Sequence, residues 1–345
     1  KQVEKNTRVK ARVKAHALRE IIESREHVMI MGHSISDTDA FGAAIGIYCA
    51  ARVLGKKAQI VLDQVTSSLR PLKEGFTTEK GYPPDMFVSS ERALELTDYN
   101  TLVMVVDVNR PSHTECPGLL KRTDSIVVFD HHRQSSEVIS NPVLSYIEPY
   151  ASSTCEMVAE VLQYFTENIK LAPHEADCIY AGILIDTSNF MTKTGVRTFE
   201  AAAYLKRCGA EVTRVRKMLR NDMDAYKARA EVVRHAEVYR GAFAISICPA
   251  DKIESPTIVG AQAADELLNI VGIKASFVLT EYQGKIYVSS RSIDEINVQK
   301  IMERLGGGGH LNMAGCQLRD CTVSQAQRII EDTIDEMLEE GDIEE

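Results

Sequence analysis

Acidic and imidazole side chains collect where apolar segments of this sequence end. Eight residues share this placement: His33, Asp37, Asp39, Asp107, Asp130, His131, His132 and Asp186. In an open α/β sheet, ligands bind outside the carboxyl ends of the strands, so we expect these side chains at one edge of one sheet. A single aspartate could be an ordinary helix or strand cap. Four separate segments that end in this way favour a shared metal site.

The four carboxylates of Asp37, Asp39, Asp107 and Asp186 would repel one another strongly if they met without counterions. Two divalent cations would neutralise them. A donor set of carboxylate and imidazole without thiolate favours Mn²⁺, with Mg²⁺, Co²⁺ or Fe²⁺ as rivals. Such a pair lowers the pKa of a bridging water and stabilises charge on a leaving oxygen. The residues therefore predict metal-dependent hydrolysis, and no base at triad-like spacing supports a covalent serine intermediate.

The elements that must position these residues alternate between apolar strands and amphipathic helices. This pattern is typical of an α/β domain with a mostly parallel sheet flanked by helices. We predict strands over residues 27–31, 58–62, 102–106 and 125–129, and helices over 40–54, 153–165 and 174–185. Ser153 and Glu156 form a candidate capping box at the start of the second helix. Residues 25–221 are expected to form the catalytic domain.

A second, smaller α/β domain is predicted to follow. The polar segment 222–240 contains no Gly or Pro and suits a connecting helix. Residues 241–345 would form the smaller domain. Its strands are expected over 243–247, 275–280, 285–289 and 313–318, and its helices over 260–270, over 298–305 and from 324 onward.

Four glycines and a histidine, residues 306–310, join a predicted helix to a predicted strand. Most glycine runs are flexible loops. Here, however, backbone N–H groups could approach a phosphate without interference from Cβ atoms. The candidate phosphate contacts in this run are Gly307, Gly308, Gly309 and His310. Arg291, near the end of a predicted strand, is either a phosphate ligand or a surface arginine, and we favour the ligand.

Composition excludes several classes of function. The 345 residues carry a net charge of −9, which argues against a grip on long nucleic acid, because such binding rests on many Lys and Arg contacts. The eight cysteines form no C-x-x-C pair, which indicates a reducing cytosol and no structural zinc. No apolar stretch is long enough for a membrane span.

Residues 1–24 are predicted to form a basic leading linker helix. Its apolar stripe consists of Val9, Val13, Leu18, Ile21 and Ile22. The sequence offers this stripe little to pack on. The helix either docks on its own domain or supports a homodimer.

The motifs together resemble those of the DHH phosphoesterase superfamily in order and spacing. The four motifs are His33-x-x-x-Asp37-x-Asp39, Asp107, Asp130-His131-His132 and Asp186. The run 306–310 resembles the glycine-rich motif of the DHHA1 substrate domain, which follows in many members. The resemblance implies a DHH domain that binds metal and a DHHA1 domain that binds substrate.

The same resemblance implies a role for each residue of the site. His33 and Asp37 would hold one cation. The other cation would be held by Asp39, His131 and Asp186, and Asp107 would bridge both. Asp130 would orient a neighbouring imidazole, and His132 would contact the substrate phosphate or act as a general acid.

A narrower likeness concerns the residues around these motifs. They are similar to the membrane-anchored cyclic-di-AMP phosphodiesterases of the GdpP type at Gly32-His33-Ser34, Asn109-Arg110-Pro111-Ser112 and Glu148-Pro149-Tyr150. The likeness implies cleavage of cyclic-di-AMP, a nucleotide second messenger, to the linear 5′-pApA. It also implies a membrane-anchored parent protein whose catalytic part faces the cytoplasm and makes no membrane contact.

Other functions fit the same plan less well. An oligoribonuclease or pAp phosphatase is the main alternative, and base preference cannot be derived from these residues. A processive exonuclease conflicts with the acidic charge. A manganese pyrophosphatase would carry a different second domain. A catalytically silent cyclic-dinucleotide sensor would be expected to have lost some of the six metal ligands, and all six are present.

Overall fold

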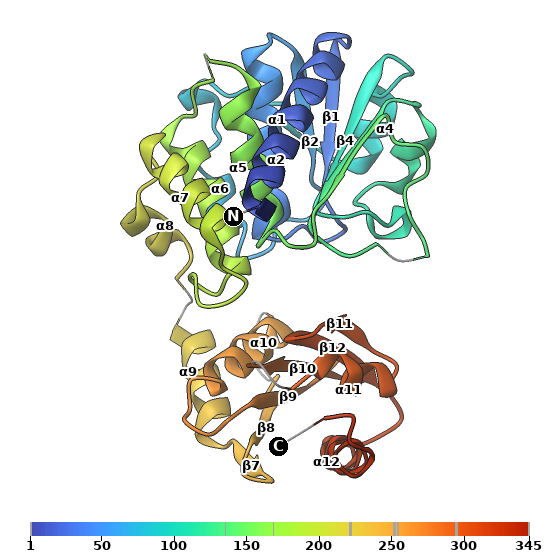
Figure 1. The fold of residues 1–345 in the computed structure, drawn as a ribbon, viewed down its shortest axis with the longest axis vertical. Coiled ribbons are helices and arrows are strands. Elements are labelled where there is room, and N and C mark those ends of the chain that lie inside the picture. Colours follow the sequence, from blue (N-terminus) through green and yellow to red (C-terminus); the bar gives the residue numbers. More distant parts are fainter. Residues whose placement is uncertain are drawn as a thin grey trace. The chain divides into compact units, whose positions relative to one another are not determined.

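A computed structural model describes residues 2–134, 136–167, 169–220, 223–250, 253, 255–293 and 296–343, with side chains described from Arg8 onward. The chain divides into two compact units, Lys1–Arg220 and Asn221–Glu345 (Figure 1). Each unit has its own sheet, with an apolar core on each face of the sheet. Within the described residues, no helix combines the length and the apolar character needed to cross a bilayer.

The first unit is built on a six-stranded parallel sheet with the order β3-β2-β1-β4-β5-β6. The strands are β1 (His27–Met31), β2 (Lys57–Val61), β3 (Phe87–Val88), β4 (Thr101–Val106), β5 (Ile126–Asp130) and β6 (Leu144–Ile147). The strands β1, β2, β4 and β5 confirm the predicted set. The predicted set lacked β3 and β6, which lie at the two edges and are short.

The chain order of this sheet reverses direction at β1. From β1 the chain adds β2 and β3 on one side, and then returns to place β4, β5 and β6 on the other side. The crevice outside the carboxyl ends of β1 and β4 is therefore the switch point at which α/β sheets bind their ligands. The structure confirms the predicted α/β class and puts the ends of the predicted strands at this edge.

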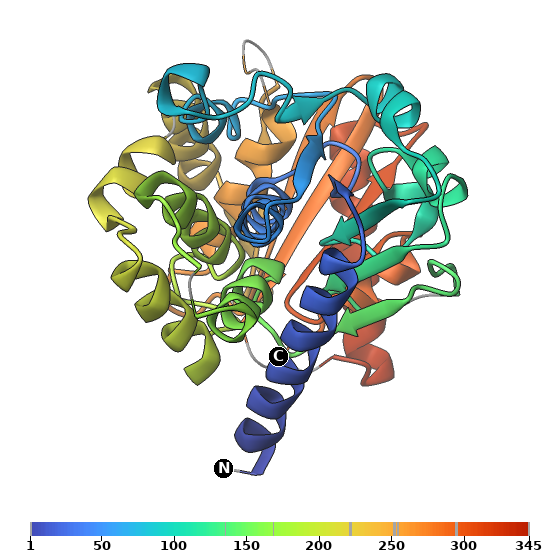
Figure 2. The ribbon, with the colours of Figure 1, turned by 90° about the horizontal axis from the view of Figure 1, so that it is seen from above.

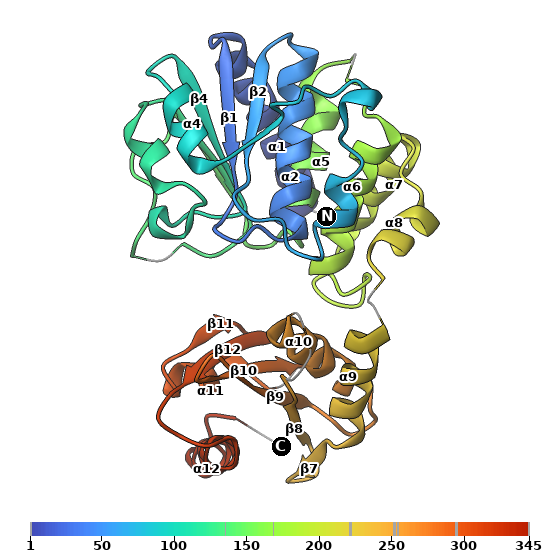
Figure 3. The same cartoon turned by 180° about the vertical axis from the view of Figure 1, so that it is seen from behind.

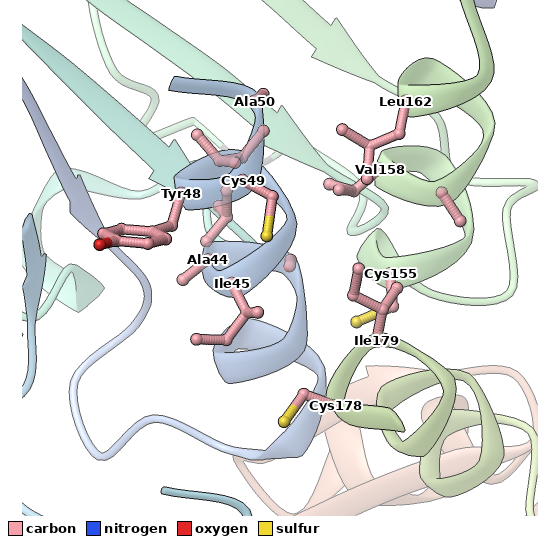
Figure 4. Packing of buried hydrophobic residues seen from close by; sticks show 14 of the residues in the cluster. Ala44, Ile45, Tyr48, Cys49, Ala50, Cys155, Val158, Leu162, Cys178 and Ile179 are labelled. Atoms are coloured by element: carbon pink, nitrogen blue, oxygen red, sulfur yellow. The ribbon is translucent and has the colours of Figure 1, made fainter. Parts of the chain in front are cut away.

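Three helices of this unit pack closely against one another: α2 (Thr38–Val53), α5 (Thr154–Phe165) and α6 (Pro173–Asp186) (Figure 4). They confirm the predicted helices within two residues at each end. Glycines allow the close approach. A Cβ on Gly42 would lie 2.5 Å from the carbonyl oxygen of Cys178, and one on Gly46 would lie 2.4 Å from Cγ1 of Val158. The first unit also contains α3 (Arg70–Lys73), α4 (Ser90–Leu96), α7 (Val196–Arg207) and α8 (Val212–Met218).

The leading helix, α1 (Gln2–Glu23), docks on its own domain against α5 and β6 (Figure 2). The predicted stripe was partly wrong, because Val9 and Val13 are 63% and 59% exposed. The buried face consists of Ala11, Ala15, Leu18 and Ile22. The small alanines let the helix approach α5 closely. Hydrogen bonds from Lys10 Nζ to Glu148 (2.9 Å) and from Lys14 Nζ to the carbonyl of Ser145 (2.7 Å) tie its polar side to the segment around β6.

The second unit contains a mixed sheet with the order β11-β12-β10-β9-β8-β7, in which only β8 and β9 are parallel. Its strands are β7 (Glu237–Tyr239), β8 (Phe243–Cys248), β9 (Ala275–Tyr282), β10 (Lys285–Ser292), β11 (Gly308–His310) and β12 (Met313–Leu318). Its helices are α9 (Met223–Arg234), α10 (Pro256–Leu267), α11 (Val298–Arg304) and α12 (Val323–Glu340) (Figure 3).

Alternation along the strands builds an apolar core on each face of this sheet. In β8, Phe243 and Ile245 join the core with α11 and α12, whereas Ala244 and Cys248 join the core with α9 and α10. This confirms the smaller α/β fold predicted for the region.

Two predicted elements of the second unit differ from the structure. The helix predicted over 222–240 ends at Arg234, and Glu237–Tyr239 pairs with β8 as the edge strand β7. Residue 222, at which the predicted helix would begin, lies outside the described residues. The helix predicted over 260–270 begins earlier, at Pro256, and ends at Leu267. Proline at a first helical position has the fixed φ that a helix start requires, and this signal was overlooked.

Candidate metal centre

Each predicted metal ligand lies at an end of an element around the switch point. His33 follows β1, and Asp107 follows β4 directly. Asp107 has a φ of +62°, a left-handed conformation that is uncommon for a residue with a side chain. This conformation turns the chain sharply as it leaves the strand. Asp39 lies in the first turn of α2, and Asp186 is the last residue of α6.

The structure brings the six predicted ligands together in two sets. One set is His33, Asp37 and Asp107, and the other is Asp39, His131 and Asp186. Within each set, one potential ligand atom per residue lies within 4.8 Å of the others. Asp107, His131 and His132 form a third set by the same measure, and this set joins the first two.

Asp107 lies between the two sets and faces both. Its Oδ2 is 3.6 Å from Nε2 of His33, and its Oδ1 is 3.4 Å from Nε2 of His131. On the first side, Nε2 of His33 is 3.4 Å from Oδ2 of Asp37. On the second side, Nε2 of His131 is 3.3 Å from Oδ2 of Asp186 and 3.7 Å from Oδ2 of Asp39. One carboxylate therefore presents one oxygen to each set.

The electrostatics of this centre favour the binding of cations. Burial raises the pKa of Asp107, and the nearby charge of Asp39 raises it further. Burial and the charge of Asp37 likewise raise the pKa of Asp39, and burial and Asp39 raise that of Asp186. Carboxylates that repel one another in a buried site are stabilised in their charged form by divalent ions. The donors are oxygen and imidazole nitrogen, so the residues fit a hard or borderline divalent metal.

The first turn of α5 holds two of these carboxylates in place. The backbone N–H groups of Thr154 and Cys155 donate to the two oxygens of Asp39, at 2.7 and 2.8 Å. The hydroxyl of Thr154 donates to Oδ1 of Asp107, at 2.8 Å. A helix N-terminus favours negative charge, so this arrangement stabilises the ionised acids. Sequence reasoning missed Thr154 because only the folded structure places α5 next to α2 and next to Asp107.

Only one of the two hydrogen bonds of the capping box predicted at this helix is present among the described residues. Ser153 caps α5 by accepting a hydrogen bond from the backbone N–H of Glu156, at 3.0 Å. The carboxylate of Glu156 is instead held by the hydroxyls of Ser152 and Thr198, both at 2.5 Å. The buried start of α5 is therefore tied to the start of α7.

Asp130 lies behind His132 and fixes the orientation of its ring. Nδ1 of His132 is 2.7 Å from Oδ1 of Asp130, and the backbone N–H of His132 donates to the same oxygen at 3.1 Å. The amide of Asn109 donates to the other oxygen at 2.5 Å. Although burial opposes it, the hydrogen bond from His132 holds the pKa of Asp130 below its usual value. The ionised Asp130 can thus keep a proton on Nδ1 of His132.

A second residue that sequence reasoning missed is Glu115. Its carboxylate accepts hydrogen bonds from the backbone N–H groups of Ile35 (3.2 Å) and Asp63 (2.8 Å). Ile35 lies inside the motif loop with a φ of +58°. Glu115 therefore braces the loop that carries His33 and Asp37. Nothing in the local sequence pattern connects it to that loop, which lies 80 positions away in the chain.

The predicted glycine loop of the second unit is largely an edge strand. Gly308–His310 form β11, paired antiparallel with β12. A Cβ on Gly307 would lie 2.1 Å from the carbonyl oxygen of Gly315, and Gly309 has a φ of +148°. Sheet packing and backbone conformation thus account for these two glycines. A Cβ on Gly308 would meet no heavy atom of the described residues within 4 Å.

Arg291 is not a surface arginine. It lies within β10 and is 9% exposed, with Nε donating to Asp265 at 2.8 Å and an Nη donating to the carbonyl of Ser290 at 2.9 Å. Burial raises the pKa of Asp265, and the nearby arginine opposes that shift. The guanidinium is thus fixed in direction by its partners.

The comparisons with known proteins match this architecture. The family model described as "DHH family, N-terminal domain" matches residues 27–183, and the model of the DHHA1 domain matches residues 243–340. The chain is a member of the DHH family. The DHH match covers the predicted site except Asp186, which follows three residues after it, and the DHHA1 match covers Arg291 and the glycine run.

Individual relatives of this DHH protein are similar over almost the whole chain. It is 42% identical to a cyclic-di-AMP phosphodiesterase, GdpP, of Geobacillus thermodenitrificans over 98% of this chain and 52% of the relative. It is 39% identical to a cyclic-di-AMP phosphodiesterase, PdeA, of Listeria monocytogenes over 96% of this chain and 51% of the relative. The chain thus spans about half the length of these relatives.

Among solved structures, an exopolyphosphatase-related protein of Bacteroides fragilis is similar in fold. The TM-score is 0.80 at 19% identity, and the match covers 92% of this chain and 94% of that protein. This similarity supports the DHH fold of the chain.

Proposed function

We propose that this DHH protein hydrolyses cyclic-di-AMP to the linear 5′-pApA with the help of two divalent cations, of which Mn²⁺ suits the donors best. The observation that carries the proposal is the position of Asp107, whose two oxygens face two sets of ligand atoms. Two relatives with identities of 42% and 39% bear the name cyclic-di-AMP phosphodiesterase, which supports the choice of substrate.

Each ligand has an assigned place in the proposal. His33, Asp37 and Asp107 would hold one cation. The other would be held by Asp107 together with Asp39, His131 and Asp186. When bound, such a pair would activate a water for attack on phosphorus and stabilise the negative charge that develops on the phosphate oxygens.

The residues of the chain supply orientation and proton transfer. Asp130 holds Nδ1 of His132 and so fixes its ring, and we assign this histidine the contact with the phosphate or the transfer of a proton to the leaving 3′ oxygen. The P–O3′ bond breaks, water supplies the new oxygen on phosphorus, and the product keeps a 5′-phosphate. His132 is 44% exposed at its side chain, which suits a group that meets substrate.

The DHHA1 domain is proposed to bind the nucleotide. Gly308 is the position of the glycine run whose small size is explained neither by packing nor by a left-handed φ, so it leaves room for a ligand near the backbone. Gly307 and Gly309 shape the strand beside it, and His310 and Arg291 are proposed as phosphate donors.

A single panel of reactions tests the proposal. Purified chain with Mn²⁺ is incubated with cyclic-di-AMP, cyclic-di-GMP, linear pApA, pAp and pyrophosphate, and products are separated by chromatography. We expect 5′-pApA from cyclic-di-AMP as the fastest reaction, its loss with EDTA, and its loss in Asp107→Asn. Asp85→Asn, at an acid paired with Lys57 and Gln59, is the matched control and should keep full activity.

Two results would contradict the proposal. Faster cleavage of pAp or linear dinucleotide would favour a phosphatase or oligoribonuclease instead. Tight binding of cyclic-di-AMP without turnover at any divalent metal would favour a sensor.

A further inference from the structure

Thr154 contacts carboxylates from both ligand sets of the DHH domain. Its backbone N–H donates to Oδ2 of Asp39 at 2.7 Å, and its hydroxyl donates to Oδ1 of Asp107 at 2.8 Å. The residue is fully buried, as is Asp39, and Asp107 is 3% exposed. A donor in such a place strongly affects the acids it touches, because water cannot replace it.

The hydrogen bond from the Thr154 hydroxyl affects the orientation of the Asp107 carboxylate. Oδ1 of Asp107 lies 3.4 Å from His131, and Oδ2 lies 3.6 Å from His33. Rotation about the terminal bond of an aspartate is soft and roughly two-fold, so the carboxylate plane needs an external restraint. The Thr154 hydroxyl supplies that restraint on Oδ1, while the two N–H groups of α5 hold both oxygens of Asp39.

We propose that Thr154 is a positioning residue that fixes the Asp107 carboxylate so that one oxygen faces each ligand set. The inference rests on the proposed two-cation function. Groups that hydrogen-bond to metal ligands orient them, and their loss lowers metal affinity by roughly 10- to 100-fold. Thr154 acts through Asp107 and Asp39 and is not itself a ligand.

A plain packing role for Thr154 would leave a different signature. Thr198 offers the matched control, because it is 1% exposed and its hydroxyl donates to the buried Glu156 at 2.5 Å. Glu156 belongs to the same helix start, but its described hydrogen bonds reach Ser152, Ser153 and Thr198 and not the metal-facing acids. Thr198→Val therefore removes a comparable buried hydroxyl away from the site.

The test measures Mn²⁺ binding directly in Thr154→Val, Thr154→Ser, Thr198→Val and the wild-type chain. Calorimetric titration gives stoichiometry and affinity, and electron paramagnetic resonance reports whether two bound Mn²⁺ are magnetically coupled. We expect Thr154→Val to lose about 10-fold or more in affinity for the second Mn²⁺ and to lose the coupled signal. Thr154→Ser, which keeps the hydroxyl, and Thr198→Val should match the wild type.

The outcomes separate this inference from the function on which it rests. Wild-type chain that binds fewer than two Mn²⁺ would overturn both. Two coupled Mn²⁺ in wild type and in Thr154→Val alike would overturn only the role of Thr154. Equal losses in Thr154→Ser and Thr154→Val would also overturn it, because packing would then be the cause. If valine prevents folding, Thr154→Ala replaces it with the same expectations, since alanine adds no atom.

Discussion

Replacing Gly182 by alanine should weaken the metal centre through a helix contact. An added Cβ would lie 2.4 Å from Sγ of Cys155, 3.1 Å from Cα of Asp39 and 3.1 Å from Oδ1 of Asp39. Unbonded heavy atoms prefer roughly 3.5–4 Å, so Sγ of Cys155 must move by about 1 Å and Asp39 by about a few tenths of an ångström. Asp39 and Cys155 are joined by hydrogen bonds, and therefore the carboxylate moves with the helix.

The magnitudes follow from two opposing effects. Overpacking of a buried contact costs roughly 1–3 kcal/mol. Alanine regains about 1 kcal/mol in a helix interior relative to glycine. We expect a net loss of about 0–2 kcal/mol in the free energy of unfolding. A displacement of about 1 Å in a catalytic site can reduce the rate about 100-fold, so the smaller shift of Asp39 should lower kcat/KM for cyclic-di-AMP by roughly 10-fold.

Gly46→Ala is the matched control for this variant. Its Cβ would lie 2.4 Å from Cγ1 of Val158, so it creates a similar clash between α2 and α5. The contacted atom belongs to an apolar side chain and touches no metal-facing acid. Urea unfolding and steady-state kinetics are measured for both variants. Similar stability losses with a rate loss confined to Gly182→Ala would support the account, whereas equal activities in the two variants would refute it.

Three further predictions test other parts of the structure. Asp130→Asn should lower kcat by roughly 10- to 100-fold while Mn²⁺ affinity stays near the wild-type value, because the substitution disturbs His132 rather than a metal ligand. Steady-state kinetics with a metal titration checks this, and an unchanged kcat would count against the role of His132. Glu115→Gln should lower the free energy of unfolding by about 1–3 kcal/mol and weaken Mn²⁺ binding, because one of two backbone N–H groups loses its acceptor. Urea unfolding and calorimetry measure the two effects, and wild-type stability would contradict the role of Glu115 in holding the loop of His33 and Asp37. Gly307→Ala should destabilise the second unit by roughly 1–3 kcal/mol in thermal unfolding, because its Cβ would clash with β12. Gly308→Ala has no such clash and should leave the stability unchanged, so equal effects of the two substitutions would contradict the strand geometry.

The catalytic edge could be predicted because its signals are local. Apolar runs followed at once by Asp107 or by the Asp-His-His triplet are visible in the sequence, and parallel strands bring such ends together. Thr154 and Glu115 could not be found in this way. Their partners lie 47 and 80 positions away along the chain, so their roles exist only after the helices and loops have packed.

The other differences have similar causes. The stripe of the leading helix was assigned to the larger residues Val9 and Val13, but the helix buries its alanines because it approaches α5 closely. The glycine run was interpreted as a phosphate-binding connection between a helix and a strand, and no strand was predicted within it because a strand made largely of glycine has no apolar alternation. Pairing with β12 decides its conformation, and the residue types within the run do not reveal that pairing.

The most direct test of the central claim is anomalous diffraction from crystals of the chain grown with Mn²⁺. We predict two Mn²⁺ peaks, one against each oxygen of Asp107, with His33 beside one peak and His131 beside the other. A single peak, or Mn²⁺ bound away from Asp107, would contradict the account.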